Sequence, residues 1–226
     1  MKLSVIIPAY NEKDTILQTI ERVAMVDLPI EIIVVDDGSN DGTTQLLKHL
    51  RQPGVLVVTH SQNLGKGAAV RTGLSHATGD FVIIQDADLE YDPSHYPRLL
   101  QPILSGRADV VFGSRFQGQI KRMTLIQKIG NSFLTLLTNI LYGVCLTDME
   151  TCYKVIPLRI IQNLNLQSRG FEFEPEVTAK LLKRGCRIVE IPIPYVARSK
   201  NEGKKINWRH GFPAMKVLLT QRFSPD

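Results

Sequence analysis

Short runs rich in valine and isoleucine alternate along the first half of the chain with segments whose apolar residues recur at helical spacing. The runs cover residues 3–7, 32–35, 55–59, 81–84 and 110–112, and turn residues bound each of them. Their length and composition predict buried strands, and the segments between them predict helices. Alternating strands and helices fold as a mainly parallel sheet with helices on both faces. Because such sheets bind ligands beyond the carboxyl ends of their strands, the residues after each run are the first candidates for a site.

The alternation becomes irregular after Arg115. A long amphipathic segment over residues 124–142 precedes a strand predicted around 152–156, a helix near 174–184 and a strand at 187–191. Residues 197–206 predict a polar loop, which a short basic helix follows. Neither a repeat nor a linker divides the 226 residues. We therefore expect a single α/β domain over 1–226, in which the second half completes the same sheet.

Charge is divided unevenly between the two halves of the chain. Residues 1–114 carry 9 basic and 14 acidic side chains, whereas residues 115–226 carry 18 and 8. The acidic half suits a bound cation, and the basic half suits phosphates or an anionic membrane surface. A nucleic-acid surface would also be basic, so charge alone does not separate these partners.

The cysteines and the N-terminal residues indicate a cytoplasmic protein. Cys145, Cys152 and Cys186 form neither an even disulfide framework nor a zinc-ligand spacing, and the first residues lack the apolar core of a signal peptide. The apolar stretch 124–144 approaches membrane-spanning length, but it contains Lys128 and several amides that are costly to place in hydrocarbon. We expect no transmembrane helix and a cytoplasmic location, either free or peripheral at the cytoplasmic face of a membrane.

Three polar clusters follow three of the predicted strands, at residues 8–12, 36–39 and 86–90. The second cluster alone is ordinary turn and helix-cap chemistry. The third is more specific, because Asp86, Asp88 and Glu90 alternate along an extended segment and would project carboxylates to one side. Carboxylate oxygens suit a hard cation such as Mg²⁺ or Mn²⁺, and such a cation would bridge the phosphates of a diphosphate. A solvated acidic loop is the alternative.

The motifs of the first half resemble the successive signatures of family 2 glycosyltransferases, which have the GT-A fold, a Rossmann-like α/β architecture. These motifs are VIIPAYNE, VVDDGSNDGT, NLGKGAAVRTG and QDADLEYDP. The second half is similar to the polyprenyl-phosphate sugar synthases of the dolichol-phosphate mannose synthase type, through VFGSRF, TDMETCYKV, RGFEFEPEVTAKLLKRG, IPIPYVARSKNEGKKI and WRHG. The resemblance covers nearly the whole chain. It implies a nucleotide-sugar and metal-binding half over 1–115 and an acceptor-side half over 116–226, with a C-terminal basic loop and helix.

The resemblance also implies which residues form the donor site. The nucleotide-sugar would contact Pro8, Tyr10, Glu12, Val35, Asp37, Asp86, Ala87, Asp88, Arg198 and Lys204. Mg²⁺ or Mn²⁺ would be held by Asp86, Asp88 and Glu90, and Asp88 is also expected to be catalytic. Lys66 and Arg71 belong to a glycine-rich turn that resembles a helix-opening loop near the donor, although a tight turn into a helix explains it as well.

On the acceptor side, the resemblance places a phosphate at Arg115, which is expected to be catalytic. The planar guanidinium of arginine donates paired, charge-assisted hydrogen bonds to phosphate oxygens. Lys128 and Ser132, one helical turn apart, would complete the phosphate site, although Lys128 could equally face solvent. Asp148 and Glu150 would border the sugar pocket.

The amphipathic segment 124–142 has two interpretations. Its apolar positions recur at helical spacing and would either cover the core or lie in a membrane interface. Core packing is the simpler explanation. The positions are Leu125, Ile129, Phe133, Leu136, Leu137 and Ile140.

The resemblance implies an inverting, metal-dependent transfer of a hexose from a GDP- or UDP-sugar to a polyprenyl or dolichyl phosphate, with mannose from GDP as the leading donor. An ionised phosphate acceptor needs no general base. A glycan or protein hydroxyl acceptor would need one, for which Glu174 and Asp148 are candidates. A dinucleotide-binding oxidoreductase is disfavoured because Gly-x-Gly-x-x-Gly does not follow the first strand. A non-catalytic basic module for membrane or nucleic acid leaves the acidic cluster unexplained, so we expect a membrane surface or a membrane partner subunit and no nucleic acid.

Overall fold

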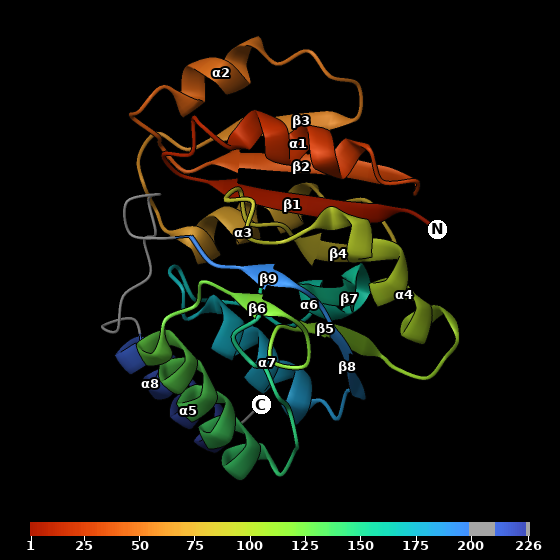
Figure 1. Cartoon of the computed structure of the whole chain (residues 1–226), viewed down its shortest axis with the longest axis vertical. Helices are drawn as coiled ribbons and strands as arrows, with labels where there is room; N and C mark the ends of the chain where they lie inside the picture. The colour runs from red at the N-terminus through yellow and green to blue at the C-terminus, as the bar shows by residue number, and fades with distance from the viewer. Residues whose placement is uncertain (199–210, 225–226) are drawn as a thin grey trace.

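Seven strands form one mixed sheet in the order β3-β2-β1-β4-β7-β5-β8 (Figure 1). The computed structural model describes residues 1–198 and 211–224. Strand β7 runs antiparallel to both of its neighbours, and the other pairs are parallel. The predicted, mainly parallel sheet is confirmed, and the reversed strand is a feature that the sequence pattern did not predict. The strands are β1 (Leu3–Ala9), β2 (Ile30–Asp36), β3 (Val55–Thr59), β4 (Phe81–Ile84), β5 (Val110–Ser114), β7 (Lys154–Pro157) and β8 (Ile188–Pro192).

Helices flank the sheet on both faces, and in Figure 1 α1 lies in front of the sheet and α3 behind it. A single 3₁₀ turn, η1 (Pro93–His95), precedes α4, and two short strands, β6 (Ile120–Lys121) and β9 (Tyr195–Val196), pair as a parallel ribbon. Because β7 and β8 come from the second half, the prediction that this half completes the same sheet is confirmed. The helices are α1 (Ile16–Ala24), α2 (Thr43–His49), α3 (Lys66–His76), α4 (Tyr96–Leu104), α5 (Leu125–Tyr142), α6 (Leu158–Gln162), α7 (Phe173–Lys183) and α8 (Gly211–Phe223).

The central strands are apolar on both faces because helices cover both. In β1, the side chains of Val5, Ile6 and Ile7 are fully buried, as expected of a parallel strand between two helical layers. Helix α3 approaches this strand closely at Gly73, where a Cβ atom would lie 2.4 Å from Cγ2 of Ile6. The close approach fixes α3, and with it the loop that opens α3 at the carboxyl edge of the sheet.

Helix α5 is defined by signals at both of its ends. The Thr124 side chain accepts a hydrogen bond from the backbone N–H of Gln127, and the Gln127 side chain accepts one from the backbone N–H of Thr124. This reciprocal cap satisfies two N–H groups that a helix start leaves without partners. Gly143 ends the helix with a φ angle of 67°, which glycine adopts without steric cost. The predicted helix over 124–142 is confirmed.

The outward face of α5 is apolar and exposed. Its inner face buries Leu134, which packs with Ala214 and Leu218 of α8, and the two helices lie side by side in Figure 1. The expectation that the apolar positions of this helix cover the core is therefore wrong, with the exception of Leu137, which is partly buried. Within 1–198 and 211–224, no helix is both long and apolar enough to cross a membrane. The side chains that are more than half exposed are Leu125, Ile126, Ile129, Phe133, Leu136 and Ile140.

Candidate functional site

The loops that follow β1 and β2 are joined by hydrogen bonds between backbone and side chains. The backbone N–H of Asn11 donates to Oγ of Ser39 over 2.9 Å, and that of Asn40 donates to Oδ1 of Asn11 over 2.9 Å. The backbone N–H of Glu12 donates to Oγ1 of Thr43, also over 2.9 Å. Two motifs that are far apart in the sequence therefore form one wall at the carboxyl edge of the sheet.

Several residues predicted to contact a nucleoside lie on this wall. Pro8 and Val35 are register partners in the adjacent strands β1 and β2. Tyr10 follows β1 and is partly exposed, whereas Glu12 is buried. The structure brings these four side chains to one edge of the sheet, and their contact with a nucleotide stays a prediction.

The Asp37 carboxylate is bonded by residues 23 to 28 positions further along the chain, which the sequence did not identify as its partners. Its carboxylate accepts hydrogen bonds from the backbone N–H groups of Leu64 and Gly65, over 2.9 and 2.8 Å. The ring of His60 bonds Asp37 through Nδ1 over 2.7 Å and Thr72 through Nε2 over 2.9 Å. Asp37 therefore fixes the turn that opens α3, whether or not it also contacts a nucleoside.

The acidic cluster follows β4 at the centre of the sheet. Ala87 is buried, and its carbonyl accepts a hydrogen bond from Oγ1 of Thr19 over 3.1 Å, which ties the cluster to α1. The first carboxylate, Asp86, lies 2.7 Å from Nζ of Lys66 at the start of α3. Burial opposes ionisation of Asp86, but the ammonium group of Lys66 lowers its pKa below the usual value.

Asp88 is linked to the wall after β1 through Arg198. One guanidinium nitrogen of Arg198 lies 3.2 Å from Oδ2 of Asp88, and its two terminal nitrogens lie 2.8 and 3.1 Å from the Glu12 carboxylate. Burial, reinforced by the carboxylates of Asp86 and Glu90, raises the pKa of Asp88 to about 7. Asp88 is thus a carboxyl group whose charged form would be stabilised by an additional cation.

Glu90 is directed differently from the two aspartates. Its carboxylate accepts hydrogen bonds from the hydroxyl of Tyr195 and from the backbone N–H of Arg198, the latter over 2.6 Å. Glu90 thereby anchors the segment after β9 that presents Arg198. Among the residues described here, no three His, Cys, Asp or Glu side chains are arranged to hold a metal ion. Glu90 is held by Tyr195 and the backbone of Arg198, and the metal-binding role of Asp86, Asp88 and Glu90 stays a prediction.

The donor set still fits a divalent cation that takes some of its ligands from phosphate. Mg²⁺ is commonly bound by one or two carboxylates, with substrate phosphates and water completing its coordination. Asp86 and Asp88 are two residues apart at the end of one strand, and burial, together with the neighbouring carboxylates, raises the pKa of Asp88. These two carboxylates are the ones that could hold Mg²⁺ or Mn²⁺.

A second charged centre lies beyond the end of β5. Arg115 is buried, and its Nε and one terminal nitrogen donate to the two oxygens of Asp148, each over 2.7 Å. The guanidinium carbon also lies 5.1 Å from the centre of the Tyr195 ring, within the range of a cation–π contact. Arg115 is therefore already held in a paired fork by a carboxylate, which sequence reasoning did not foresee. Its phosphate-binding role stays a prediction.

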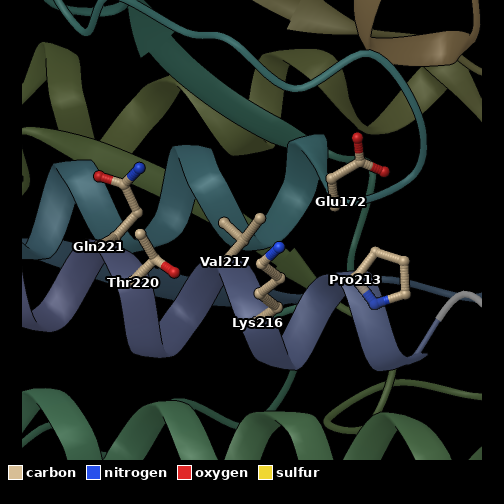
Figure 2. Close-up of a pocket in the computed structure, with 6 residues that line it drawn as sticks. All are labelled: Glu172, Pro213, Lys216, Val217, Thr220 and Gln221. Carbon is tan, nitrogen blue, oxygen red and sulfur yellow. The ribbon is translucent and has the colours of Figure 1, made fainter.

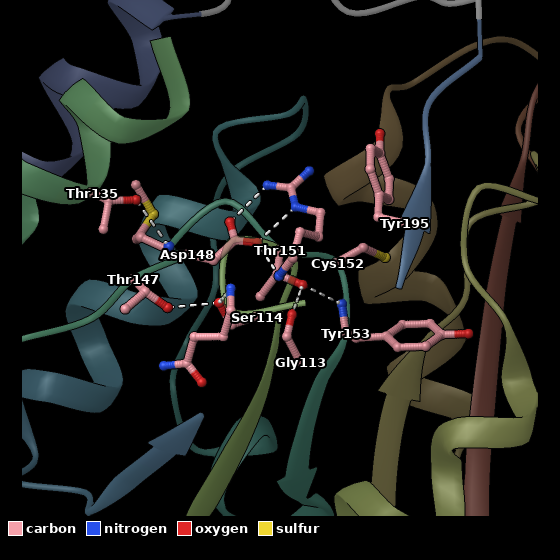
Figure 3. Close-up of polar contacts among 12 residues, drawn as sticks. Gly113, Ser114, Thr135, Thr147, Asp148, Thr151, Cys152, Tyr153 and Tyr195 are labelled. Atoms are coloured by element: carbon pink, nitrogen blue, oxygen red, sulfur yellow. Dashed lines mark hydrogen bonds and ion pairs between the residues drawn. The ribbon is translucent and has the colours of Figure 1, made fainter. Parts of the chain in front are cut away.

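The loop that carries Asp148 is fixed from two sides, and Figure 3 shows the side on which Thr135 lies. Glu190 of β8 accepts hydrogen bonds from the backbone N–H groups of Thr147 and Asp148 over 2.8 and 2.9 Å. On the other side, Oγ1 of Thr135 in α5 accepts one from the backbone N–H of Met149 over 3.1 Å. The exposed helix α5 is thus joined through one short loop to the carboxylate that holds Arg115.

Three other predicted site residues have less structural definition. Lys128 is partly exposed and Ser132 exposed on α5, one turn apart as predicted. Lys204 lies outside the described residues. The acceptor and donor roles of these three side chains stay predictions.

A cluster of buried charge lies between the two centres. Nζ of Lys154 lies 2.5 Å from Oε2 of Glu174, and Nζ of Lys66 lies 3.8 Å from Oε1 of Glu174. Glu150 has one carboxyl oxygen that is buried without a hydrogen-bond partner. Burial is the main reason that the pKa of Glu150 rises to about 7. Glu150 is therefore a proton-accepting group poised near neutrality.

Only one feature of the sequence points to this buried cluster. A lysine at position 154, between Tyr153 and Val155 in a predicted strand, is unusual because lysine is rarely buried without a partner. Glu190 and Tyr195 carry no comparable signal, since their partners are distant in the chain.

A hollow of about 400 Å³ lies elsewhere, between the start of α7 and α8 (Figure 2). None of the predicted site residues lines it. Its lining residues are Glu172, Pro213, Lys216, Val217, Thr220 and Gln221.

Known proteins share both the sequence and the fold of this chain. The chain is 29% identical to the UDP-N-acetylglucosamine–dolichyl-phosphate N-acetylglucosaminyltransferase of Methanococcus voltae, covering 95% of this chain and 93% of that protein. It is 28% identical to the dolichol-phosphate mannosyltransferase of Pyrococcus furiosus, covering 90% of this chain but only 59% of that protein. The chain therefore spans less than two thirds of the length of the Pyrococcus relative.

Among solved structures, glucosyl-3-phosphoglycerate synthase from Mycobacterium tuberculosis superposes with a TM-score of 0.75 at 22% identity, covering 100% of this chain and 81% of that one. That synthase has also been solved with Mn²⁺, UDP and phosphoglyceric acid. At this identity the likeness establishes the GT-A fold alone. The family model described as glycosyl transferase family 2 matches residues 4–153 of this chain. With this match over most of its length, the chain belongs to glycosyl transferase family 2.

Proposed function

We propose that this glycosyltransferase transfers a hexose from a nucleotide-sugar to a polyprenyl or dolichyl phosphate at a membrane surface, with inversion at the anomeric carbon. GDP-mannose is the first donor to test and UDP-N-acetylglucosamine the second, because the Pyrococcus and Methanococcus relatives are named for these sugars. The observation that carries the proposal is the connection between the exposed apolar face of α5 and Arg115. This connection runs through Thr135 and the loop that bears Asp148.

The donor half of the proposal rests on the charges around β4. Asp86 and Asp88 would hold Mg²⁺ or Mn²⁺, which when bound would offset the negative charge that develops on the departing nucleoside diphosphate. Pro8, Tyr10, Val35 and Asp37 would line the nucleoside site. Arg198 and Lys204 would contact the diphosphate. Together these residues would hold the anomeric carbon in place for attack by an acceptor oxygen.

The acceptor half rests on Arg115 and its surroundings. An ionised phosphate is already a nucleophile, so its oxygen can attack the anomeric carbon while the bond to the diphosphate breaks, without a general base. Asp148 and the ring of Tyr195 hold the Arg115 guanidinium in place. Lys128 and Ser132 on α5 would lie on the route from the bilayer to this arginine.

The exposed apolar face of α5 supports a lipid acceptor. A polyprenyl chain leaves a bilayer at a cost of about 0.8 kcal/mol per CH₂ group, so the enzyme must reach the lipid in place. Six large apolar side chains that are more than half exposed on one helix would have a favourable environment in the interfacial region of a bilayer. A peripheral position at the cytoplasmic face, alone or with a membrane partner subunit, is part of the proposal.

A second candidate acceptor is a glycan or protein hydroxyl, which one observation favours. Such an acceptor needs a proton-accepting group, and Glu150 has a pKa of about 7 and a buried oxygen without a partner. The earlier candidates are less suited, because Asp148 is occupied by Arg115 and Glu174 by Lys154. Glu150 therefore replaces them as the base to test.

A donor and acceptor panel tests the proposal. The purified protein is supplied with GDP-mannose, UDP-glucose or UDP-N-acetylglucosamine and Mn²⁺, together with liposomes containing dolichyl phosphate or, as the matched control, dolichol. We expect sugar transfer to dolichyl phosphate and none to dolichol. Equal transfer to both lipids would replace the phosphate acceptor with the hydroxyl acceptor. Hydrolysis of the donor without transfer to either would reject a polyprenyl acceptor.

A further inference from the structure

The two carboxylates that fit a divalent cation are each already paired with a basic side chain. Asp86 lies 2.7 Å from Nζ of Lys66, and Asp88 lies 3.2 Å from the guanidinium of Arg198. All four side chains are mostly buried, with 13 to 23% of each exposed. A buried carboxylate without a partner is costly, so these basic groups stabilise the site in the absence of a metal ion.

Both carboxylates lie beside positive charge that a bound cation would also face. Lys66 contacts Asp86 and Glu174, and Arg198 contacts Asp88 and Glu12 and donates its backbone N–H to Glu90. A divalent cation alone would lie close to an ammonium and a guanidinium group, and this like-charge repulsion disfavours its binding. The two negative charges of a nucleotide-sugar diphosphate, bound together with the cation, would offset that repulsion. The site is therefore matched to both ligands together.

The local geometry allows the side chain of Lys66 to move while its backbone stays fixed. Gly65 and Gly67 on either side of Lys66 pack against the backbone of residues 168–169, where an added Cβ would come within 2.3 and 2.5 Å of carbonyl oxygens. Asp37 holds the N–H of Gly65 as well. A lysine with a fixed backbone and a four-carbon stem can redirect its ammonium group between two nearby anions.

Arg198 also has unused hydrogen-bonding capacity. Its terminal nitrogens bond Glu12 and Asp88, but its Nε is buried without a partner. A buried donor that lacks a partner costs free energy, and an incoming phosphate oxygen would relieve that cost.

We propose that Lys66 and Arg198 pair with the metal-binding carboxylates Asp86 and Asp88 in the free protein. When cation and donor bind together, both basic side chains leave these carboxylates and bond the donor diphosphate instead. Lys66 thereby becomes a ligand of the donor phosphates, in addition to the residues named for the donor site. That the ligand bound with the cation is a nucleotide-sugar rests on the proposed function, whereas the pairing of Asp86 and Asp88 with Lys66 and Arg198 does not. The exchange makes cation and nucleotide bind cooperatively, each weakly without the other.

Two titrations test the exchange, with Mn²⁺ alone and with GDP or UDP at saturating Mn²⁺. The variants are Lys66→Met and Arg198→Gln, and the matched control is Lys13→Met, which removes one positive charge beside Glu12 from an exposed side chain. We expect both variants to bind Mn²⁺ alone about 3- to 10-fold more tightly and the nucleotide about 10-fold more weakly, because losing one charged contact changes an affinity by roughly this factor. The control should leave both affinities near those of the parent protein.

The opposite signs of the two effects make the proposal falsifiable. Weaker binding of Mn²⁺ alone in Arg198→Gln, or an unchanged nucleotide affinity in both variants, would overturn it. Equal tightening of Mn²⁺ binding in Lys13→Met would reduce the effect to long-range charge and would also overturn it. Thermal unfolding confirms that each variant is folded, and if Lys66→Met does not fold, Arg198→Gln and Lys66→Arg carry the test. If the parent binds neither nucleotide, the proposed function fails while the Mn²⁺ titration still tests the pairing.

Discussion

Asp86 and Asp88 are two residues apart, yet their surroundings move their pKa values in opposite directions. Lys66 lowers the pKa of Asp86 against the effect of burial, whereas burial and two neighbouring carboxylates raise that of Asp88 to about 7. Asp88 is consequently the residue whose charge depends most on an added cation. Removing the charge of Asp88 should lower activity without lowering the stability of the fold, because a buried carboxylate beside other carboxylates contributes little to stability.

Asp88→Asn should lower the transfer rate by about 100-fold or more, since a lost electrostatic contact in the transition state typically costs this much. Mn²⁺-dependent binding of the nucleotide should weaken as well, while the unfolding temperature should stay the same or rise. Initial rates, titration calorimetry and thermal unfolding measure these effects. Asp27→Asn, the same change at an exposed position, is the control. An Asp88→Asn variant with parental rate and metal dependence would remove Asp88 from the site.

Arg115→Lys should impair use of the acceptor more than binding of the donor. Lysine keeps the positive charge but lacks the two parallel N–H groups that bond the Asp148 carboxylate. The charged group at position 115 is therefore no longer held in the same orientation. We expect KM for dolichyl phosphate to rise about tenfold, with the affinity for nucleotide unchanged. A fall in stability of about 1–3 kcal/mol should accompany it, because part of a buried charged network is broken. Unchanged acceptor kinetics in a folded variant would place the acceptor phosphate elsewhere.

Glu150 makes stability depend on pH. Its folded pKa of about 7 lies above the unfolded value of 4.5, so the folded state favours the protonated carboxyl. This contribution is complete below about pH 4.5 and is lost as the pH rises through 7. Glu150→Gln removes the titration. Its unfolding free energy should therefore rise relative to the parent by up to about 3 kcal/mol between pH 5 and pH 8.

Urea unfolding at the two pH values measures this difference, and Glu21→Gln, at an exposed position of α1, is the control. Identical pH dependence in parent and Glu150→Gln would show that Glu150 titrates normally. Activity separates the two acceptor proposals. Loss of activity with a flattened pH profile in Glu150→Gln would favour a hydroxyl acceptor, and retained activity would favour a phosphate.

At the scale of elements, the sequence predicted the regular parts of the fold. The strands at β3 and β4 match their predicted limits, and α5 agrees closely, because apolar runs and helix caps are local signals. The reversed direction of β7 and the ribbon of β6 and β9 depend on long-range pairing, which a short run does not encode. The site shows the same division. The acidic cluster was found from spacing, whereas the partners of Arg115 and Asp37 come from distant segments.

The exposure of the apolar face of α5 also differs from the expectation that this face covers the core, for a related reason. Helical spacing of apolar residues shows that one face is apolar, but it does not show what covers that face. Here the core takes up Leu134, Thr135 and Thr138, and the wider apolar stripe faces outward.

Strand β8 should position the acceptor centre through Glu190. The Glu190 carboxylate accepts hydrogen bonds from the backbone N–H groups of Thr147 and Asp148. The side-chain amide of a glutamine would instead point an N–H donor at one of these N–H groups. Glu190→Gln should therefore raise KM for dolichyl phosphate about 3- to 10-fold through misplacement of Asp148 and Arg115, with KM for the donor unchanged. Steady-state kinetics against each substrate measure the split, with Glu21→Gln as control. A parallel rise in both KM values would indicate general loosening of the fold instead.

At the scale of the whole molecule, the two chemical centres share one sheet and differ in what they face. The acidic cluster follows β4 and is bounded by the loops after β1 and β3, whereas Arg115 follows β5 and connects to α5. Figure 1 shows α5 and α8 together at the opposite end of the molecule from α2 and β3. A bilayer that contacted α5 would therefore leave the nucleoside wall on the side away from the lipid.

Docking through α5 should be measurable with liposomes. The protein should sediment with anionic liposomes at low salt, and salt should weaken but not abolish binding, because screening over a Debye length of about 10 Å at 0.1 M acts on charges and not on apolar contacts. Ile129→Asp and Phe133→Asp, each placing a charge on the apolar face, should lower the bound fraction about tenfold, since a carboxylate is costly in the interface. Met25→Asp is the control, because Met25 is 81% exposed in the other half of the chain and is not part of α5. Equal sedimentation of parent and α5 variants would exclude this face from docking. Failure of the parent to sediment at low salt would favour a membrane partner subunit or an acceptor outside the bilayer.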